Sequence, residues 1–223
     1  MWDPLAASAA VEGVKREFES DVKSVSQIEN ASSSKIDFYH LKLIGTSRLL
    51  TVALWQRVAP ILPHGLYVRS PRLIFSSYTD GYSLMSLLNH ATTEGPSLLL
   101  LKTNDETILA ICRDDPWINR NDVYGCPETV IIRINNGATA FWRGVQAQDK
   151  KYIYIRSTDE YLMVGAGGSK GIALYSNKDF SRVTSESSEV FCNPPLVDVD
   201  VFQIVCIELF SLDIYHLCFI HII

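Results

Sequence analysis

The chain has 223 residues, of which 47% are hydrophobic and 20% are charged, so it can bury a substantial core. Its formal net charge of −5 argues against a protein that binds nucleic acid or an anionic membrane through a broad basic face. The five cysteines are dispersed and no Cys-x-x-Cys pair occurs, a pattern typical of structural thiols in a reducing, cytoplasmic compartment. The first dozen residues hold no long apolar run, so we expect no secretory signal.

The first third of the chain is predicted to be helical or irregular. Residues 1–35 mix charges with few apolar side chains and end in a serine-rich stretch, which indicates a flexible or weakly helical extension. Residues 36–72 form a helical lead-in, because Leu50, Ala53, Leu54 and Val58 share one helical face before Pro60 and Pro63 end the pattern.

A second helix is predicted over residues 83–90. Ser83 can cap its first turn, and apolar side chains follow with helical spacing at Leu84, Leu87, Leu88 and Ala91. The Asp80-Gly81 pair just before Ser83 supplies a turn.

From residue 97 onward the pattern is typical of β structure. Strands are predicted over 97–102, 108–113, 129–134, 138–143, 151–156, 161–165, 172–175 and 201–209. Asn136-Gly137 between two of these strands is a strong hairpin signal. About eight or nine short strands with turn residues between them predict an α+β, mostly β fold, a two-layer antiparallel β-sandwich flanked by a few helices.

Four glycines, Gly165, Gly167, Gly168 and Gly171, lie between two strand-like runs. A dinucleotide fingerprint would need a glycine where Lys170 stands, and a Walker A loop would need the reverse order of Ser169-Lys170-Gly171. Both motifs must also open a helix, whereas a β-branched and aromatic run comes next here. We therefore expect two strands that turn tightly and lie close together, and no nucleotide cofactor.

The last 25 or so residues are strongly apolar, a feature that raises the question of a membrane span. Asp200, Glu208 and Asp213 interrupt this run, and each acid at a bilayer centre costs about 2.5–3.5 kcal/mol. We expect a buried final strand rather than a transmembrane segment. Residues 212–223 form a separate apolar tail of undecided status, an aggregation hazard if it is exposed.

Several sequence pieces occur in a characteristic order, at residues 73–84, 96–102, 124–128, 164–168 with 172–175, and 191–196 with 202–205. Together they resemble the TLDc domain over roughly residues 60–211, which places a TLDc-like domain at 73–211. The lead-in is most similar to the TLDc part of TBC–TLDc fusion proteins. A TBC domain does not fit in this chain, so we expect no GTPase-activating chemistry. The family commonly has Gly-Thr-Gly-Glu where Gly125, Cys126, Pro127 and Glu128 stand, and its glycine run is longer.

The resemblance implies a β-sandwich with helices and a non-enzymatic interaction module. It suggests a cytoplasmic protein, peripheral on vesicles, that docks on the vacuolar proton pump (V-ATPase) and is linked to oxidative-stress resistance or vesicle traffic. No transmembrane segment, metal or nucleic-acid partner is expected. Partner-binding candidates are loop residues, because loops on a rigid scaffold usually carry binding: Asp80, Gly81, Gly125, Glu128, Gly165, Gly167, Gly168 and Gly171.

Two alternatives stay open. The chain could be a cryptic enzyme that uses Glu128 with Cys126 or Glu189, although a general acid or base needs a partner within hydrogen-bond reach and a tuned pKa. It could also be a truncated regulatory fragment of a TBC–TLDc protein. His216, Cys218 and His221 fall short of the four ligands of a structural zinc site.

Overall fold

The computed structural model describes residues 40–146 and 151–212. The predictions made for residues 1–35 and for the tail beyond Leu212 lie outside these ranges. Within them, no helix is long and apolar enough to cross a membrane.

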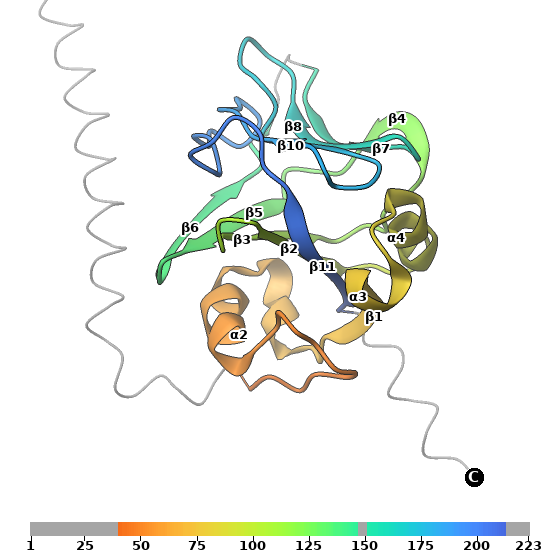
Figure 1. Ribbon diagram of the computed structural model, residues 1–223. Helices are drawn as coiled ribbons and strands as arrows, with labels where there is room; N and C mark the ends of the chain where they lie inside the picture. Colours follow the sequence, from red (N-terminus) through yellow and green to blue (C-terminus); the bar gives the residue numbers. More distant parts are fainter. Residues whose placement is uncertain (1–39, 147–150, 213–223) are drawn as a thin grey trace, which may run out of the picture. The chain divides into compact units, whose positions relative to one another are not determined.

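Two antiparallel sheets pack face to face (Figure 1), as the sequence predicts. The larger sheet has the order β1-β11-β2-β3-β5-β6 and the smaller one the order β10-β9-β8-β7-β4. The strands of the larger sheet are β1 (Arg72–Ser76), β2 (Ser97–Thr103), β3 (Ile108–Arg113), β5 (Val130–Asn135), β6 (Ala138–Arg143) and β11 (Ile204–Ser211). Those of the smaller sheet are β4 (Arg120–Tyr124), β7 (Ile153–Ser157), β8 (Tyr161–Ala166), β9 (Leu174–Asn177) and β10 (Val183–Thr184).

The alternation of side chains divides the larger sheet into two apolar faces. Leu99, Ile111 and Ile131 stand opposite one another across β2, β3 and β5, and all three belong to the core between the sheets. That core is completed from the smaller sheet by Ile155, Leu162, Val164 and Leu174. The alternate residues of β2, such as Leu98 and Leu100, are equally buried but on the outer face. The prediction that this strand is buried on both faces is therefore confirmed.

The outer face of the larger sheet is covered by the lead-in (Figure 1). Helix α2 (Val52–Val58) is capped by Thr51, whose hydroxyl accepts from the backbone N–H of Leu54 at 3.1 Å. It buries Leu54, Trp55 and Val58. Two short 3₁₀ helices come next, Ala59–Ile61 and Pro63–Val68, so the two prolines do end the α-helix. Leu50 is buried but lies before the helix begins.

Helices α3 (Ser77–Asp80) and α4 (Leu84–Ala91) connect β1 to β2. Ser83 caps α4 as predicted, and its hydroxyl accepts from the backbone N–H of Ser86 at 3.2 Å. The four apolar positions of α4, Leu84, Leu87, Leu88 and Ala91, are all buried against the core. Helical spacing therefore located this element correctly.

Two strand connections are set by positive backbone φ angles. In the β5–β6 hairpin, φ is 48° at Asn136 and 82° at Gly137, the signature of a two-residue type I′ turn. Strands β8 and β9 pair antiparallel on either side of the glycine segment, and the N–H of Ala173 donates to the carbonyl of Gly165 at 3.0 Å. The glycines thus join neighbouring strands, as expected, rather than opening a helix.

The strand prediction was incomplete. Strands β1, β4 and β10 were missed, because β4 carries the charged or polar residues Arg120, Asn121 and Asp122 and β10 is only two residues long. The final strand begins at Ile204 rather than at residue 201. Residues 196–201 form bends, and Phe202 makes a single bridge to Val183 of the smaller sheet. Tertiary pairing therefore overrides the alternating Val-Asp pattern of this stretch.

Candidate functional site

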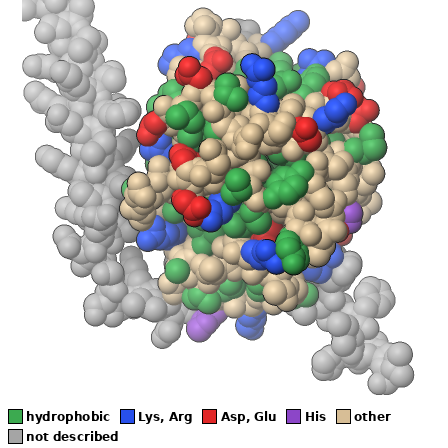
Figure 2. Space-filling view, viewed as in Figure 1, with side chains coloured by type: hydrophobic (Ala, Val, Ile, Leu, Met, Phe, Trp, Pro, Cys, Tyr) green, Lys and Arg blue, Asp and Glu red, His purple; other side chains and the backbone are tan. Residues whose placement is uncertain are grey.

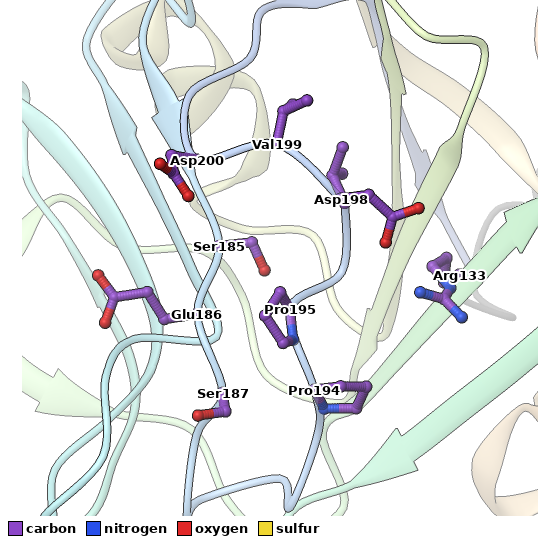
Figure 3. Close-up of a pocket in the computed structure, with 10 residues that line it drawn as sticks. Arg133, Ser185, Glu186, Ser187, Pro194, Pro195, Asp198, Val199 and Asp200 are labelled. Atoms are coloured by element: carbon purple, nitrogen blue, oxygen red, sulfur yellow. The ribbon is translucent and has the colours of Figure 1, made fainter.

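A groove lies between β5 of the larger sheet and the irregular segment after β10 (Figure 3). Serine hydroxyls hold this segment against the smaller sheet. The Ser185 hydroxyl donates to the carbonyl of Ala173 at 2.6 Å and accepts from the N–H of Leu196 at 2.8 Å. The Ser188 hydroxyl donates to the carbonyl of Gly165 at 2.7 Å. Each serine is buried, so the segment is tied to β8 through Gly165 and to the residue just before β9, Ala173.

A proline corner forms the middle of the groove wall. Asn193 is buried, and its side-chain N–H groups donate to the carbonyls of Glu186 and Pro194 at 3.2 and 2.8 Å. Pro194 and Pro195 come next and fix the chain direction. The wall therefore combines a hydrogen-bonded turn with two rigid rings.

The groove has a volume of about 590 Å³ and is mainly acidic. It is lined by three carboxylates, Glu186, Asp198 and Asp200, against one guanidinium, that of Arg133. In Figure 3, Asp198 and Arg133 lie on one side of Pro195, whereas Glu186 and Asp200 lie on the other side. Such a groove favours cationic or hydrogen-bonding groups over anions.

The glycine segment packs directly beside this groove. A Cβ atom at Gly171 would come within 1.8 Å of the Glu186 carboxylate, and one at Gly168 within 2.3 Å of the Glu189 carboxylate. Glu189 accepts from the backbone N–H of Ser169 at 3.1 Å and from the Ser169 hydroxyl. The glycines therefore allow two glutamates to approach the backbone. Glu189 stabilises the glycine segment through its hydrogen bonds with Ser169.

The 125–128 turn lies in the same region, through a chain of contacts. Gly125, with φ of 88°, allows the side chain of Tyr154 to lie against its backbone. The Tyr154 hydroxyl donates to the carbonyl of Val145 at 2.7 Å, and the N–H of Val145 donates to the carbonyl of Val190 at 2.8 Å. Val190 is the residue after Glu189. The structure thus connects the 125–128 turn with the glycine segment.

Glu128 itself is exposed on that turn, and Cys126 is half-buried in it. The turn is closed by the N–H of Thr129, which donates to the carbonyl of Cys126 at 3.1 Å. Among the residues that the structure describes, no cluster of three or more His, Cys, Asp or Glu side chains could hold a metal ion. The suggested catalytic pairing of Glu128 with Cys126 or Glu189 stays a prediction.

Asp80 and Gly81 lie elsewhere, at the end of α3, whereas β8 lies near the top of the view in Figure 1. The Asp80 carboxylate accepts from the backbone N–H of Ser76 at 2.8 Å, and Gly81 has φ of 78°. Both residues therefore shape the turn between α3 and α4. The turn lies beside a second cleft of about 440 Å³, whose lining includes Arg48, Tyr78, Tyr82, Lys102 and Cys206.

Two cationic side chains line this cleft, and each has a partner. The Arg48 guanidinium lies 3.2 Å from the centroid of Tyr78, and Lys102 pairs with Glu106 at 2.6 Å. The Tyr82 hydroxyl donates to the carbonyl of Val205. On the face shown in Figure 2, basic and acidic side chains are interspersed with apolar ones, without a broad basic surface.

Burial, followed by the negative charge of Glu208, raises the pKa of the Cys206 thiol. A raised pKa reduces the thiolate fraction at neutral pH, so we expect alkylation of Cys206 to require a higher pH than alkylation of free cysteine. Burial also raises the pKa of Cys112, which should stay unmodified in the folded chain. Iodoacetamide labelling from pH 7 to 10, read by peptide mass spectrometry, measures this order. Labelling of Cys112 before Cys206 would contradict it.

The sequence interpretation missed most of the residues that line both cavities. Arg133 was placed on a predicted strand without a site, and Asp198 and Asp200 fell next to a predicted strand. The Asn193-Pro194-Pro195 stretch was the available signal, because two prolines after an asparagine predict a rigid, exposed turn before a strand. No local signal joins that turn to Arg133, since their proximity arises from the packing of two sheets.

The family model of the TLDc domain matches residues 43–213. The chain belongs to the TLDc family. This confirms the resemblance seen in the sequence, and it includes most of the lead-in within the domain. A relative, "GTPase-activating protein skywalker" of Drosophila melanogaster, is 23% identical over an alignment of 181 residues, which covers 74% of this TLDc chain. The match covers 30% of that relative, so the chain spans less than a third of its length.

Proposed function

We propose that this TLDc protein is a non-enzymatic interaction module that docks on a larger protein assembly through the loops around its acidic groove. The observation that carries the proposal is the groove itself. Its walls are held by buried serine and asparagine hydrogen bonds, while its lining presents carboxylates and proline rings to solvent. A rigid scaffold with exposed loops is the usual form of a recognition site.

The assembly we propose is the vacuolar proton pump, with roles in oxidative-stress resistance or vesicle traffic and with peripheral association on vesicles. The support is membership of the TLDc family and the proximity of the 125–128 turn to the glycine segment. The predicted binding residues of these loops are Gly125, Glu128, Gly165, Gly167, Gly168 and Gly171. Asp80 and Gly81 would contribute separately.

The test is affinity capture from cytosol and from solubilised vesicle membranes, with the full chain as bait and with ATP, ADP or no nucleotide. We expect pump subunits in the wild-type sample and fewer with Lys170→Glu, a charge reversal on the exposed glycine segment. Lys178→Glu, at an exposed position that pairs with Glu160 at 3.1 Å, is the matched control. Absence of pump subunits under every nucleotide condition would refute the pump as partner.

A second candidate function is favoured by the relative. Because that relative is named a GTPase-activating protein, this chain could be a regulatory piece of a TBC–TLDc protein that competes for partners without catalysing GTP hydrolysis. TBC-coding sequence in frame upstream of this chain would support this function. If the transcripts contain no TBC-coding sequence in frame upstream, this second function is refuted.

A further inference from the structure

The four edge strands of the two sheets differ in how they are protected. The edge of β1 is met by Ile44, which bridges to Arg72, and the edge of β10 is met by Phe202, which bridges to Val183. Strand β4 carries exposed charged and polar side chains and an irregular register, two features that discourage strand pairing. Strand β6 is the fourth edge, and among the described residues its ladder joins it to β5 alone.

The open edge of β6 offers backbone groups for pairing. In a two-residue hairpin the flanking pair, here Asn135 and Ala138, exchanges hydrogen bonds, so the groups of Thr139 and Phe141 face away from β5. The side chains of this strand are mostly small or apolar, and Phe141 is 45% exposed. Exposed edges of this kind are templates for an added strand.

A polar cavity adjoins this edge, with one carboxylate and one guanidinium in its lining. It has a volume of about 260 Å³, and Ala138, Thr139 and Ala140 line it together with Asp198 and Arg133. Asp198 and Arg133 also line the larger groove of Figure 3, so the two cavities adjoin. Ala138 and Ala140 stand opposite Asn135 and Arg133 on the same face of the hairpin, and their short side chains line the cavity together with Asp198. Alternate side chains of an added strand would enter this space.

We propose that β6, the adjoining cavity and the acidic groove next to it bind an extended segment of a protein partner, bearing lysine or arginine at alternate positions, as an added strand. The backbone of the segment pairs with Thr139 and Phe141, and its basic side chains meet Asp198 and, further along, Asp200. The charge of the larger groove selects a basic segment, since its lining holds three carboxylates and one guanidinium. This proposal rests on the proposed docking function and names the chemistry of the partner.

The test uses the purified full chain and a fluorescein-labelled peptide of alternating lysine and valine, seven residues long. We expect binding by fluorescence anisotropy, and none by the matching glutamate–valine peptide or by a lysine–valine peptide N-methylated at alternate residues. Asp198→Asn should weaken binding about tenfold, as expected for loss of one charge-assisted hydrogen bond. Asp122→Asn, on the edge strand β4, is the control and should leave binding unchanged.

Thr139→Pro should abolish binding, because proline removes an N–H that faces away from β5. If this variant unfolds, the N-methylated peptide still tests backbone pairing, because it removes N–H groups from the peptide and leaves the protein unchanged. Equal binding of the lysine and glutamate peptides, or of the N-methylated and unmodified peptides, would overturn the proposal. The proposal would also be overturned if the chain sediments as a dimer and Thr139→Pro abolishes that dimer. The edge would then pair with a second copy of the chain. These results are independent of whether the pump is captured.

Discussion

Gly165→Ala is expected to lower the free energy of unfolding by about 2–5 kcal/mol. About 1–2 kcal/mol of this loss comes from the left-handed backbone, with φ of 71°, which disfavours a side chain. The remainder, about 1–3 kcal/mol, comes from overpacking. A methyl group at this position would lie 2.6 Å from the ring of Phe191 and 2.8 Å from the Cβ of Ala173, both of which are buried. Urea denaturation followed by tryptophan fluorescence measures the change.

Gly65→Ala separates these two causes. Gly65 has a similar φ of 70°, but a methyl group there would meet no heavy atom within 4 Å. The expected loss is therefore the backbone component alone, about 1–2 kcal/mol. If both variants lose the same stability, the close approach of β8 to Phe191 contributes nothing, and our explanation of the glycine segment is wrong.

Glu208→Gln is expected to lower the free energy of unfolding by roughly 2–4 kcal/mol, because it removes hydrogen bonds to a charged, buried group. Glu208 lies on β11 and is fully buried. Its carboxylate accepts from the backbone N–H of Arg48 at 2.8 Å, from that of Leu49 at 3.1 Å, and from the hydroxyl of Ser47. An amide in this place would direct N–H groups at donors. Urea denaturation gives the magnitude, and hydrogen exchange at residues 48–50 reports local release.

Glu106→Gln is the matched control for this substitution. Glu106 is 76% exposed and pairs with Lys102 on the surface, so its neutralisation should change stability by about 0–1 kcal/mol. A loss at Glu208 no larger than at Glu106 would show that the carboxylate does not anchor the lead-in. From the contacts of Glu208 we infer that the lead-in and the sandwich unfold together, as the start of the family match at residue 43 suggests.

Much of the fold could be predicted because its determinants are local. The Asn136-Gly137 pair adopts two positive φ angles, which few residue types tolerate, so the hairpin is specified within four residues. Ser83 caps α4 through its own hydroxyl, and the apolar spacing after it identifies the buried face. The glycine run excluded a phosphate-binding helix because a β-branched and aromatic stretch comes directly after it.

The candidate site could be predicted only in part. The loops at the glycine segment and at 125–128 were chosen because loops on a rigid scaffold usually carry binding, and the structure connects the two through a chain of contacts. The groove was missed because Arg133 and Asp198 are distant in sequence and meet through sheet packing. Asp80 and Gly81 were chosen as binding residues, and the structure shows their task in the turn next to the cleft of Cys206.

The sequence by itself determined the class of fold and the family, since alternation, turn residues and motif order are properties of short segments. The tertiary structure alone decided which strands are edges, and that Glu208 is an anchor rather than an exposed acid. It also decided that the Val-Asp alternation of 197–201 becomes a groove wall and not a strand. The physical reason is that pairing and burial depend on partners more than a hundred residues away, as Glu208 and Arg48 are, and no local propensity encodes that distance.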